Sequence, residues 1–186
     1  GMVYEVAPGP GAIVGAWALP MVSSGPQGND VAFLNGEILV TDSRQIQDVN
    51  VHVSITHTFV SDLQISLIAP WGTEIQLFNR RGANGQNLTA TTFDDEGTAA
   101  IASGSAPFSG VFRPEQALGA FDGHAANGTW TLVVIDDTSD SGFSAGGFAG
   151  GWSLSVNDLD FGVQTVNVPS AARTPMAPIT VNTRSG

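Results

Sequence analysis

Regular alternation of apolar and polar residues is the feature that most constrains the fold of this chain. Residues 49–58 read VNVHVSITHT, in which every second residue from Val49 to Ile55 is Val or Ile and the residues between them are polar. Because successive side chains of an extended strand point to opposite faces, this pattern predicts a strand that buries one face. Similar strands are expected at 62–70, 73–78, 129–136 and 152–156. The chain is therefore predicted to be all-β.

The composition agrees with one domain of short strands. The chain has 186 residues, of which 23 are glycine and 10 are proline, and 12% are charged. A chain of this length buries roughly two-thirds of its surface on folding, which suits one hydrophobic core. Residues 79–90 and 93–110 are small and polar and are expected to be surface loops. Pro114 can begin a helical turn, so at most one short helix is expected within 111–128.

One of the predicted strands carries apolar residues on both faces. Trp130, Leu132 and Val134 share one face, and Val133 and Ile135 share the other. A strand that is apolar on both sides is typical of a central position in a sheet. This strand is therefore expected in the middle of a sandwich.

The charge of the chain is strongly negative. The sequence contains 17 Asp or Glu, 6 Arg and no Lys, and its net charge is −11. Nucleic acids and anionic membranes bind cationic surfaces, so neither is expected as a partner. The apolar stretch at 11–20 is shorter than the roughly 20 residues that cross a bilayer, so no membrane insertion is expected. A cation is the natural partner of such a surface.

Acidic residues cluster at the ends of the predicted strands. Asp62 ends a turn, and Asp94 and Asp95 lie in a loop. Asp136 and Asp140 lie at and after the end of the strand expected at 129–136. Calcium takes six to eight oxygen ligands in irregular geometry, and carboxylates from separate loops can supply them. Aspartate also favours turns because it hydrogen-bonds to its own backbone. The sequence leaves both interpretations open, a Ca²⁺ site or plain turn residues.

The chain contains a short match to the serine hydrolase motif G-x-S-x-G. GFSAG at 142–146 places Ser144 at the nucleophile position. That motif works on a strand-to-helix turn, with a histidine later in the chain. Glycines follow Ser144 and the last histidine is His124, so we expect no catalysis here. His57, at the end of a predicted strand, is interpreted as a hydrogen-bonded structural residue.

Five segments in a fixed order resemble a known family. They are ITHTFVSDLQISLIAPWGTEIQLF (55–78), FDDEG (93–97), FRPEQAL (112–118), NGTWTLVVIDDTSDSG (127–142) and GGWSLSV (150–156). Together they resemble the P domain, also called the P/Homo B domain, which follows the catalytic domain in kexin- and furin-like subtilisin proteases. The resemblance covers residues 31–157, and the spacing of the segments follows the bacterial versions closely.

The resemblance implies a fold and a role. The fold is an eight-stranded β-sandwich with jelly-roll topology, similar to galactose-binding-like domains. The role is accessory and non-catalytic: such domains pack against a protease catalytic domain, in cis or in trans, and adjust its stability and its dependence on calcium or pH. The resemblance also implies export to the extracellular space or the cell surface. Its loops match the suspected Ca²⁺ ligands, which are Asp62, Asp94, Asp95, Asp136 and Asp140.

The regions that flank this domain receive separate expectations. Residues 1–30 are expected to be an extended N-terminal segment, and residues 158–186 to add a strand, pack as a tail or pair with another copy. An alternative to the accessory role is an extracellular binding module for carbohydrate or protein. In that case Trp71 would be an exposed sugar platform, whereas Trp130 and Trp152 are expected in the core.

Overall fold

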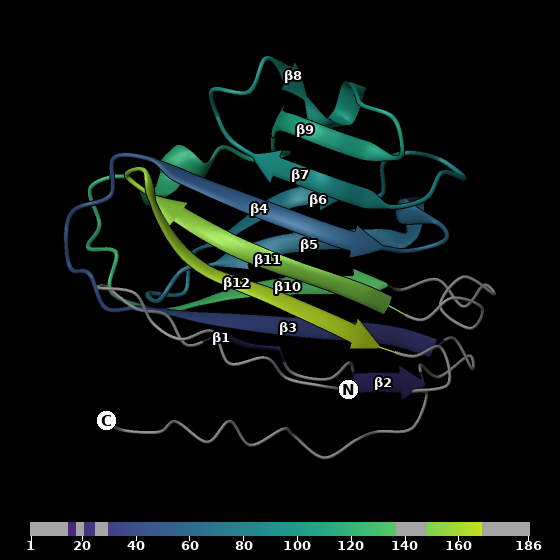
Figure 1. Cartoon of the computed structure of the whole chain (residues 1–186), viewed down its shortest axis with the longest axis horizontal. Helices are drawn as coiled ribbons and strands as arrows, with labels where there is room; N and C mark the ends of the chain where they lie inside the picture. The colour runs from purple at the N-terminus through teal and green to yellow at the C-terminus, as the bar shows by residue number, and fades with distance from the viewer. Residues whose placement is uncertain (1–14, 18–20, 25–29, 137–147, 169–186) are drawn as a thin grey trace.

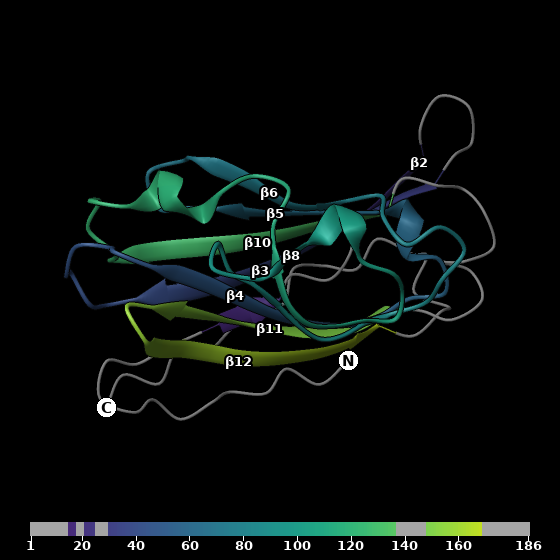
Figure 2. The same ribbon diagram turned by 90° about the horizontal axis from the view of Figure 1, so that it is seen from above.

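Two β-sheets form the molecule. The computed structural model describes residues 15–17, 21–24, 30–136 and 148–168. Within these residues the chain forms two six-stranded sheets that pack face to face, which Figure 2 shows edge-on. The first sheet has the order β1–β3–β10–β5–β6, and β2 also pairs with β3. Its strands are β1 (Gly15–Trp17), β2 (Met21–Ser24), β3 (Asp30–Val40), β5 (Leu63–Ile68), β6 (Glu74–Asn79) and β10 (Gly128–Asp136).

The second sheet has the order β12–β11–β4–β7–β9–β8. Its strands are β4 (Val49–Thr56), β7 (Leu88–Phe93), β8 (Ala99–Ala100), β9 (Phe108–Arg113), β11 (Phe148–Val156) and β12 (Leu159–Val168). The helices of the described residues are single 3-10 turns: η1 (Val60–Asp62), η2 (Ile101–Ser103) and η3 (Leu118–Phe121). Figure 1 shows both sheets with their strands labelled.

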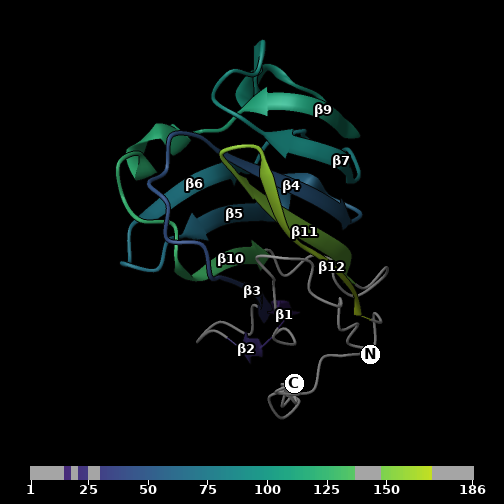
Figure 3. The same cartoon turned by 60° about the vertical axis from the view of Figure 1, so that its left-hand side comes forward.

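The chain crosses repeatedly between the two sheets. β3 lies in the first sheet, β4 in the second, β5 and β6 in the first, β7 to β9 in the second, and β10 in the first again. Such crossing is typical of a jelly roll. Figure 3 shows β9, β7, β4, β11 and β12 in one layer, with β6, β5 and β10 behind them. The predicted all-β sandwich is confirmed, but the described residues form twelve strands instead of the eight that the resemblance implied, because β1, β2 and β12 lie outside residues 31–157 and β8 is an additional two-residue strand.

The core lies between the sheets and is made by the inward face of each strand. On β4, Val51 and Val53 are fully buried, whereas His52 between them is exposed. Trp130 on β10 and Trp152 on β11 have exposed fractions of 0% and 1%, which confirms their predicted place in the core. Burial of each such side chain stabilises the fold by about 1.5–3 kcal/mol. β10 lies between β3 and β5, as its two apolar faces predicted.

Two segments predicted as surface loops contain strands. β7 begins at Leu88, inside the loop expected at 79–90, and the region 93–110 contains β8, η2 and the start of β9. β9 pairs in parallel with β7, and Phe108 at its start is fully buried. The predictions were wrong because the small residues of these segments hide the two-residue period. In addition, parallel partners are not joined by a hairpin turn, so no turn signal marks them.

A tight turn joins β11 to β12. Asn157 and Asp158 form it, with φ angles of 49° and 62°. Two successive positive φ angles are what a type I′ hairpin turn requires, and Asn and Asp tolerate them better than most residues. β12 extends the second sheet beyond β11 in this way.

Candidate functional site

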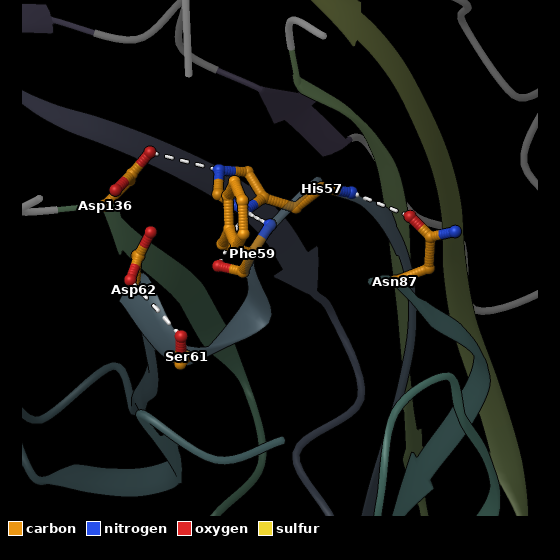
Figure 4. A network of polar contacts seen from close by, with 6 residues as sticks. All are labelled: His57, Phe59, Ser61, Asp62, Asn87 and Asp136. Atoms are coloured by element: carbon orange, nitrogen blue, oxygen red, sulfur yellow. Dashed lines mark hydrogen bonds and ion pairs between the residues drawn. The ribbon is translucent and has the colours of Figure 1, made fainter. Parts of the chain in front are cut away.

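A buried polar pair joins the two sheets at one end of the sandwich. His57 follows β4 on its inward face, and Asp136 is the last residue of β10. The His57 Nε2 atom lies 3.0 Å from Asp136 Oδ2, and the two side chains have exposed fractions of 0% and 3%. Figure 4 shows the imidazole pointing at the carboxylate. Since polar groups buried this deeply must be hydrogen-bonded, the contact ties the end of β4 to the end of β10.

Asn87 and Phe59 satisfy the other polar groups of His57. Its main-chain N–H donates to Asn87 Oδ1 at 3.0 Å, and the Asn87 N–H donates back to the His57 carbonyl at 3.1 Å. The ring Nδ1 lies 3.0 Å from the Phe59 carbonyl oxygen and 3.2 Å from the Phe59 nitrogen. A neutral ring can therefore accept from Phe59 and a protonated ring can donate to it. The interpretation of His57 as a hydrogen-bonded strand-end residue is confirmed.

Asp62 lies beside this pair. It ends η1, its side chain is half-buried, and its Oδ1 accepts a hydrogen bond from Ser61 Oγ at 3.3 Å. The next residue, Leu63, is the register partner of Asp136 across β5 and β10. The structure therefore brings together Asp62 and Asp136, two of the predicted metal ligands, as Figure 4 shows.

Asp94 and Asp95 lie at the opposite end of the sandwich. They follow Phe93, which pairs with Val51 near the start of β4, whereas His57 follows the end of that strand. His57 lies six residue steps along the chain from Val51, which corresponds to about 20 Å. The predicted ligands therefore form two separate groups.

Both carboxylates of this second group hold the local backbone. Asp95 accepts main-chain hydrogen bonds from Leu118 at 3.0 Å and Gly119 at 2.8 Å, so it anchors η3. Asp94 Oδ1 accepts from the Glu96 nitrogen at 2.7 Å, a bond between near neighbours of the kind that stabilises turns. Turn chemistry thus accounts for these contacts.

An acidic pocket that the sequence did not indicate lies next to Asp95. It has a volume of about 30 Å³ and is lined by Gln47, Asp48, Val49, Asp95, Glu96, Leu118, Gly119 and Asp122. The pKa of Asp48 is raised, first by burial and then by repulsion from Asp94, Asp158, Asp122 and Asp95. The Glu96 pKa is also raised, chiefly by a hydrogen bond with the Asp94 carboxyl group. Carboxylates thus concentrate at this end.

Neither group amounts to a complete calcium site within the described residues. No three His, Asp or Glu side chains of the described part of the chain are placed to hold one metal ion. Calcium requires six to eight oxygen ligands. Asp140, the fifth suspected ligand, lies outside the described residues. Calcium binding therefore stays a prediction.

The family of the chain follows from a comparison with protein-family models. The model of the proprotein convertase P-domain matches residues 46–145, which is more than half of the chain. The chain belongs to the proprotein convertase P-domain family. All five suspected calcium ligands of this P-domain lie within the matched residues.

Two solved protease structures are similar to the P-domain chain. One is the Aeromonas sobria serine protease in complex with a chaperone, at 20% identity and a TM-score of 0.38, covering 84% of this chain and 24% of that one. The other is the serine protease of Aeromonas sobria, at 19% identity and a TM-score of 0.37, covering 86% and 25%. The P-domain chain therefore spans about a quarter of the length of these proteases. No curated protein matches it significantly.

Trp71 of the P-domain packs against its neighbours. The indole is half-buried and stacks on the His124 ring, with centroids 4.2 Å apart and planes 12° apart. Phe121 and Trp130 contact it edge-on at 5.9 and 5.5 Å. A sugar ring that stacked on this face of Trp71 would have to displace His124, so the geometry does not favour the predicted platform.

Two predictions remain, one on the GFSAG motif and one on membrane insertion. The GFSAG motif at 142–146, with Ser144, lies outside the described residues. Within the described residues, no helix has the length and hydropathy needed to cross a membrane.

Proposed function

We propose that this P-domain is a non-catalytic accessory domain that stabilises or regulates a secreted, subtilisin/kexin-like serine protease. The observation that carries the proposal is the family match over residues 46–145. The buried His57–Asp136 pair supports it, because both partners are sequestered in the core and hold strands together. Such a pair stiffens a scaffold and is closed to a substrate. An exported location is part of this proposal.

The accessory role is tested by its effect on protease stability. We expect the purified domain, mixed with the subtilisin-like proteases of its source organism, to lengthen the thermal-inactivation half-life of its partner. A partner that binds only the folded protease stabilises it by RT ln(1 + [L]/Kd), about 2.7 kcal/mol at a hundredfold excess over Kd. The proposal is contradicted if the half-lives of all these proteases stay unchanged, both when the purified domain is added and when the domain is deleted from a parent chain.

Two surface variants locate the contact. Leu39 on β3 and Val111 on β9 have exposed fractions of 41% and 48%, and they lie on different sheets. Leu39→Glu and Val111→Glu each place a charge on one sheet without entering the core. The variant that abolishes the stabilisation identifies the docking sheet, and the other serves as its matched control.

Calcium binding is the second part of the proposal. Asp62 and Asp136 are its favoured ligands because the structure places them side by side. We expect the melting temperature to fall in EDTA and to recover when Ca²⁺ is added. Asp62→Asn should abolish this response, whereas Asp94→Asn, at the other end of the sandwich, should leave it intact. A melting temperature that neither EDTA nor Ca²⁺ changes would contradict calcium binding by these five aspartates.

A further inference from the structure

Three Asn-Gly pairs occur in the chain, and this pair is the dipeptide most prone to spontaneous deamidation. They are Asn35–Gly36, Asn84–Gly85 and Asn127–Gly128. In this reaction the main-chain nitrogen after the asparagine attacks the side-chain amide carbon. Glycine permits it best, because no Cβ hinders the attack and the backbone can rotate freely. A folded chain slows the reaction where that nitrogen is held in place, so the structure can rank the three pairs.

The first pair lies inside a sheet. Gly36 is buried in β3, and its register partners are Trp17 on β1 and Leu132 on β10. With a neighbouring strand on each side, its backbone can reach the reactive geometry only if the sheet opens. Openings of central strands cost nearly the full free energy of unfolding. The Gly36 nitrogen is therefore held away from the reactive geometry.

The second pair lies in a tightly packed loop. The Gly85 nitrogen donates to the Gly82 carbonyl at 2.9 Å, and the Gly85 carbonyl accepts from Val60 at 3.0 Å. A Cβ at position 85 would collide with Ala106, and one at position 128 would collide with Pro70, so close packing does not distinguish these two pairs and the ranking rests on the hydrogen bonds of Gly85. The attacking nitrogen at this pair is thus engaged, although the Asn84 side chain itself is exposed.

The third pair lies at the end of a strand. Asn127 is exposed, and Gly128 begins β10. At this point β10 has a partner only on the β3 side, Val40, because its pairing with β5 starts at Thr131. Strand ends open with much lower free energies than strand centres. Because Gly128 lies at a strand end with a partner on one side, whereas Gly36 lies between two strands and Gly85 is held by two loop hydrogen bonds, we infer that the Gly128 nitrogen is the least restrained of the three.

We propose that Asn127 is the deamidation site of this chain. The Gly128 nitrogen forms a bond to Asn127 Cγ, the bond from Cγ to the amide nitrogen breaks, and ammonia leaves with the proton of the Gly128 nitrogen. Water then opens the resulting succinimide at either carbonyl, which gives aspartate or isoaspartate. One water is consumed, one ammonia is released, and either product adds a carboxylate.

The isoaspartate product strains the start of β10. It inserts one carbon into the main chain directly before Gly128. At that residue the backbone is already in close contact with Pro70, since a Cβ on Gly128 would lie 2.5 Å from the Pro70 Cβ. Trp130, fully buried in the core, lies two residues further along β10. Chains that carry isoaspartate at 127 are expected to melt at a lower temperature than fresh protein.

Peptide mapping of aged protein tests the proposal. The full chain is incubated at mildly alkaline pH, below its melting temperature, and aspartate and isoaspartate at positions 35, 84 and 127 are quantified by mass spectrometry over time. We expect position 127 to react at least about tenfold faster than either other position, which corresponds to a difference of about 1.4 kcal/mol in local opening. A folded protein in which position 84 or 35 reacts as fast as 127 overturns the proposal.

Two controls separate the fold from the sequence. In strong denaturant the three rates should converge, because all three pairs are then exposed; a denatured chain that keeps the folded ranking also overturns the proposal. Asn127→Gln removes the five-membered ring route at that position. This variant should lose the modification at 127, keep the slow rates at 84 and 35, and avoid the fall in melting temperature on ageing.

Discussion

At the scale of single residues, His57 and Asp136 show how one polar contact can unite two sheets. Neither side chain is exposed by more than 3%, and each comes from the inward face at the end of its strand. A buried group that loses its partner retains its desolvation cost without the compensating bond. The stability of this end of the sandwich therefore depends on both residues being present.

Removal of one partner should destabilise the domain strongly. For Asp136→Ala we expect a loss of about 1–3 kcal/mol if the pair is neutral and about 3–5 kcal/mol if it is ionised. Urea unfolding measures the loss, and the double variant with His57→Ala gives the coupling energy. His52→Ala is the matched control, because His52 lies on the same strand with its ring exposed, and it should change stability by less than about 0.5 kcal/mol. If Asp136→Ala and His52→Ala lower the stability equally, a special role for the buried pair is refuted.

Asp48 makes a pH-dependent contribution whose sign can be worked out. Its pKa is raised in the folded state, chiefly by burial and then by neighbouring carboxylates. The folded state therefore binds its proton more tightly, so stability is greatest below the unfolded pKa and falls as pH rises through the folded pKa. Asp48→Asn should raise the melting temperature at neutral pH and have little effect well below the unfolded pKa. A stabilisation of the same size at both pH values would rule out titration of Asp48 as its cause.

The sequence predicted correctly that His57 is a hydrogen-bonded structural residue, but it did not predict that Asp136 is its partner. The two-residue period placed His57 on the same face as Val51 and Val53, and Asp136 on the same face as Trp130. Each strand by itself thus indicated an inward polar end. The two-residue period does not show how the sheets stack on each other. That stacking brings the ends of β4 and β10 together. The acidic pocket was missed for a related reason, since Asp48 and Asp95 are brought together by the pairing of β4 with β7, which the period of either strand does not give.

At the scale of elements, the turn between β11 and β12 does more than reverse the chain. The Asn157 Oδ1 accepts main-chain hydrogen bonds from Gln47 at 2.8 Å and Asp48 at 3.1 Å. Its Nδ2 donates to the Gln45 carbonyl at 2.8 Å. The turn thereby fastens the segment that precedes β4, about 110 residues earlier in the chain.

Two substitutions separate the conformation of this turn from its side-chain bonds. Asn157→Gly keeps the positive φ and removes the three hydrogen bonds, which should cost about 1–3 kcal/mol. Asn157→Ala removes the same bonds and adds roughly 1–2 kcal/mol for a left-handed backbone with a Cβ. Asp158→Gly, at the neighbouring turn position, is the control and should leave the denaturant midpoint nearly unchanged. If Asn157→Ala proves as stable as Asn157→Gly, the positive φ has no energetic weight here.

Elements with strong local signals were predicted well. β4, β5, β6 and β10 each agree with a predicted strand to within two residues, because alternation and flanking turns mark them in the sequence. β9 was missed because its sequence, FSGVFR, has Gly110 between Phe108 and Phe112, where a period of two requires a large apolar residue. Its place in the sheet comes instead from parallel pairing with β7, which is a tertiary interaction.

At the scale of the whole molecule, electrostatic repulsion opposes the compact state. The net charge is −11, and carboxylates of several loops meet around the Asp48 pocket. Repulsion of this kind destabilises a folded chain and is screened by salt. The screening length is about 30 Å at 0.01 M ionic strength and about 8 Å at 0.15 M.

Salt should therefore stabilise the domain at neutral pH. We expect the melting temperature to rise as NaCl is added up to physiological strength, and to rise equally with KCl, because screening does not distinguish the two cations. The slope should be shallower for Asp48→Asn, which removes one of the repelling charges. A melting temperature that falls with salt would show that attractive ion pairs, such as Arg81–Glu115, outweigh the repulsion.

Acidic groups gather around Asp48 at one end of the sandwich, which makes the surface charge uneven along β4. Asp94, Asp95, Asp122 and Asp158 each repel Asp48 at this end, while the His57–Asp136 pair lies at the far end of β4. On a positively charged bead the domain should consequently settle acidic end first. Molecules immobilised in that way would share one orientation, with the end that carries Asp62 facing the solvent.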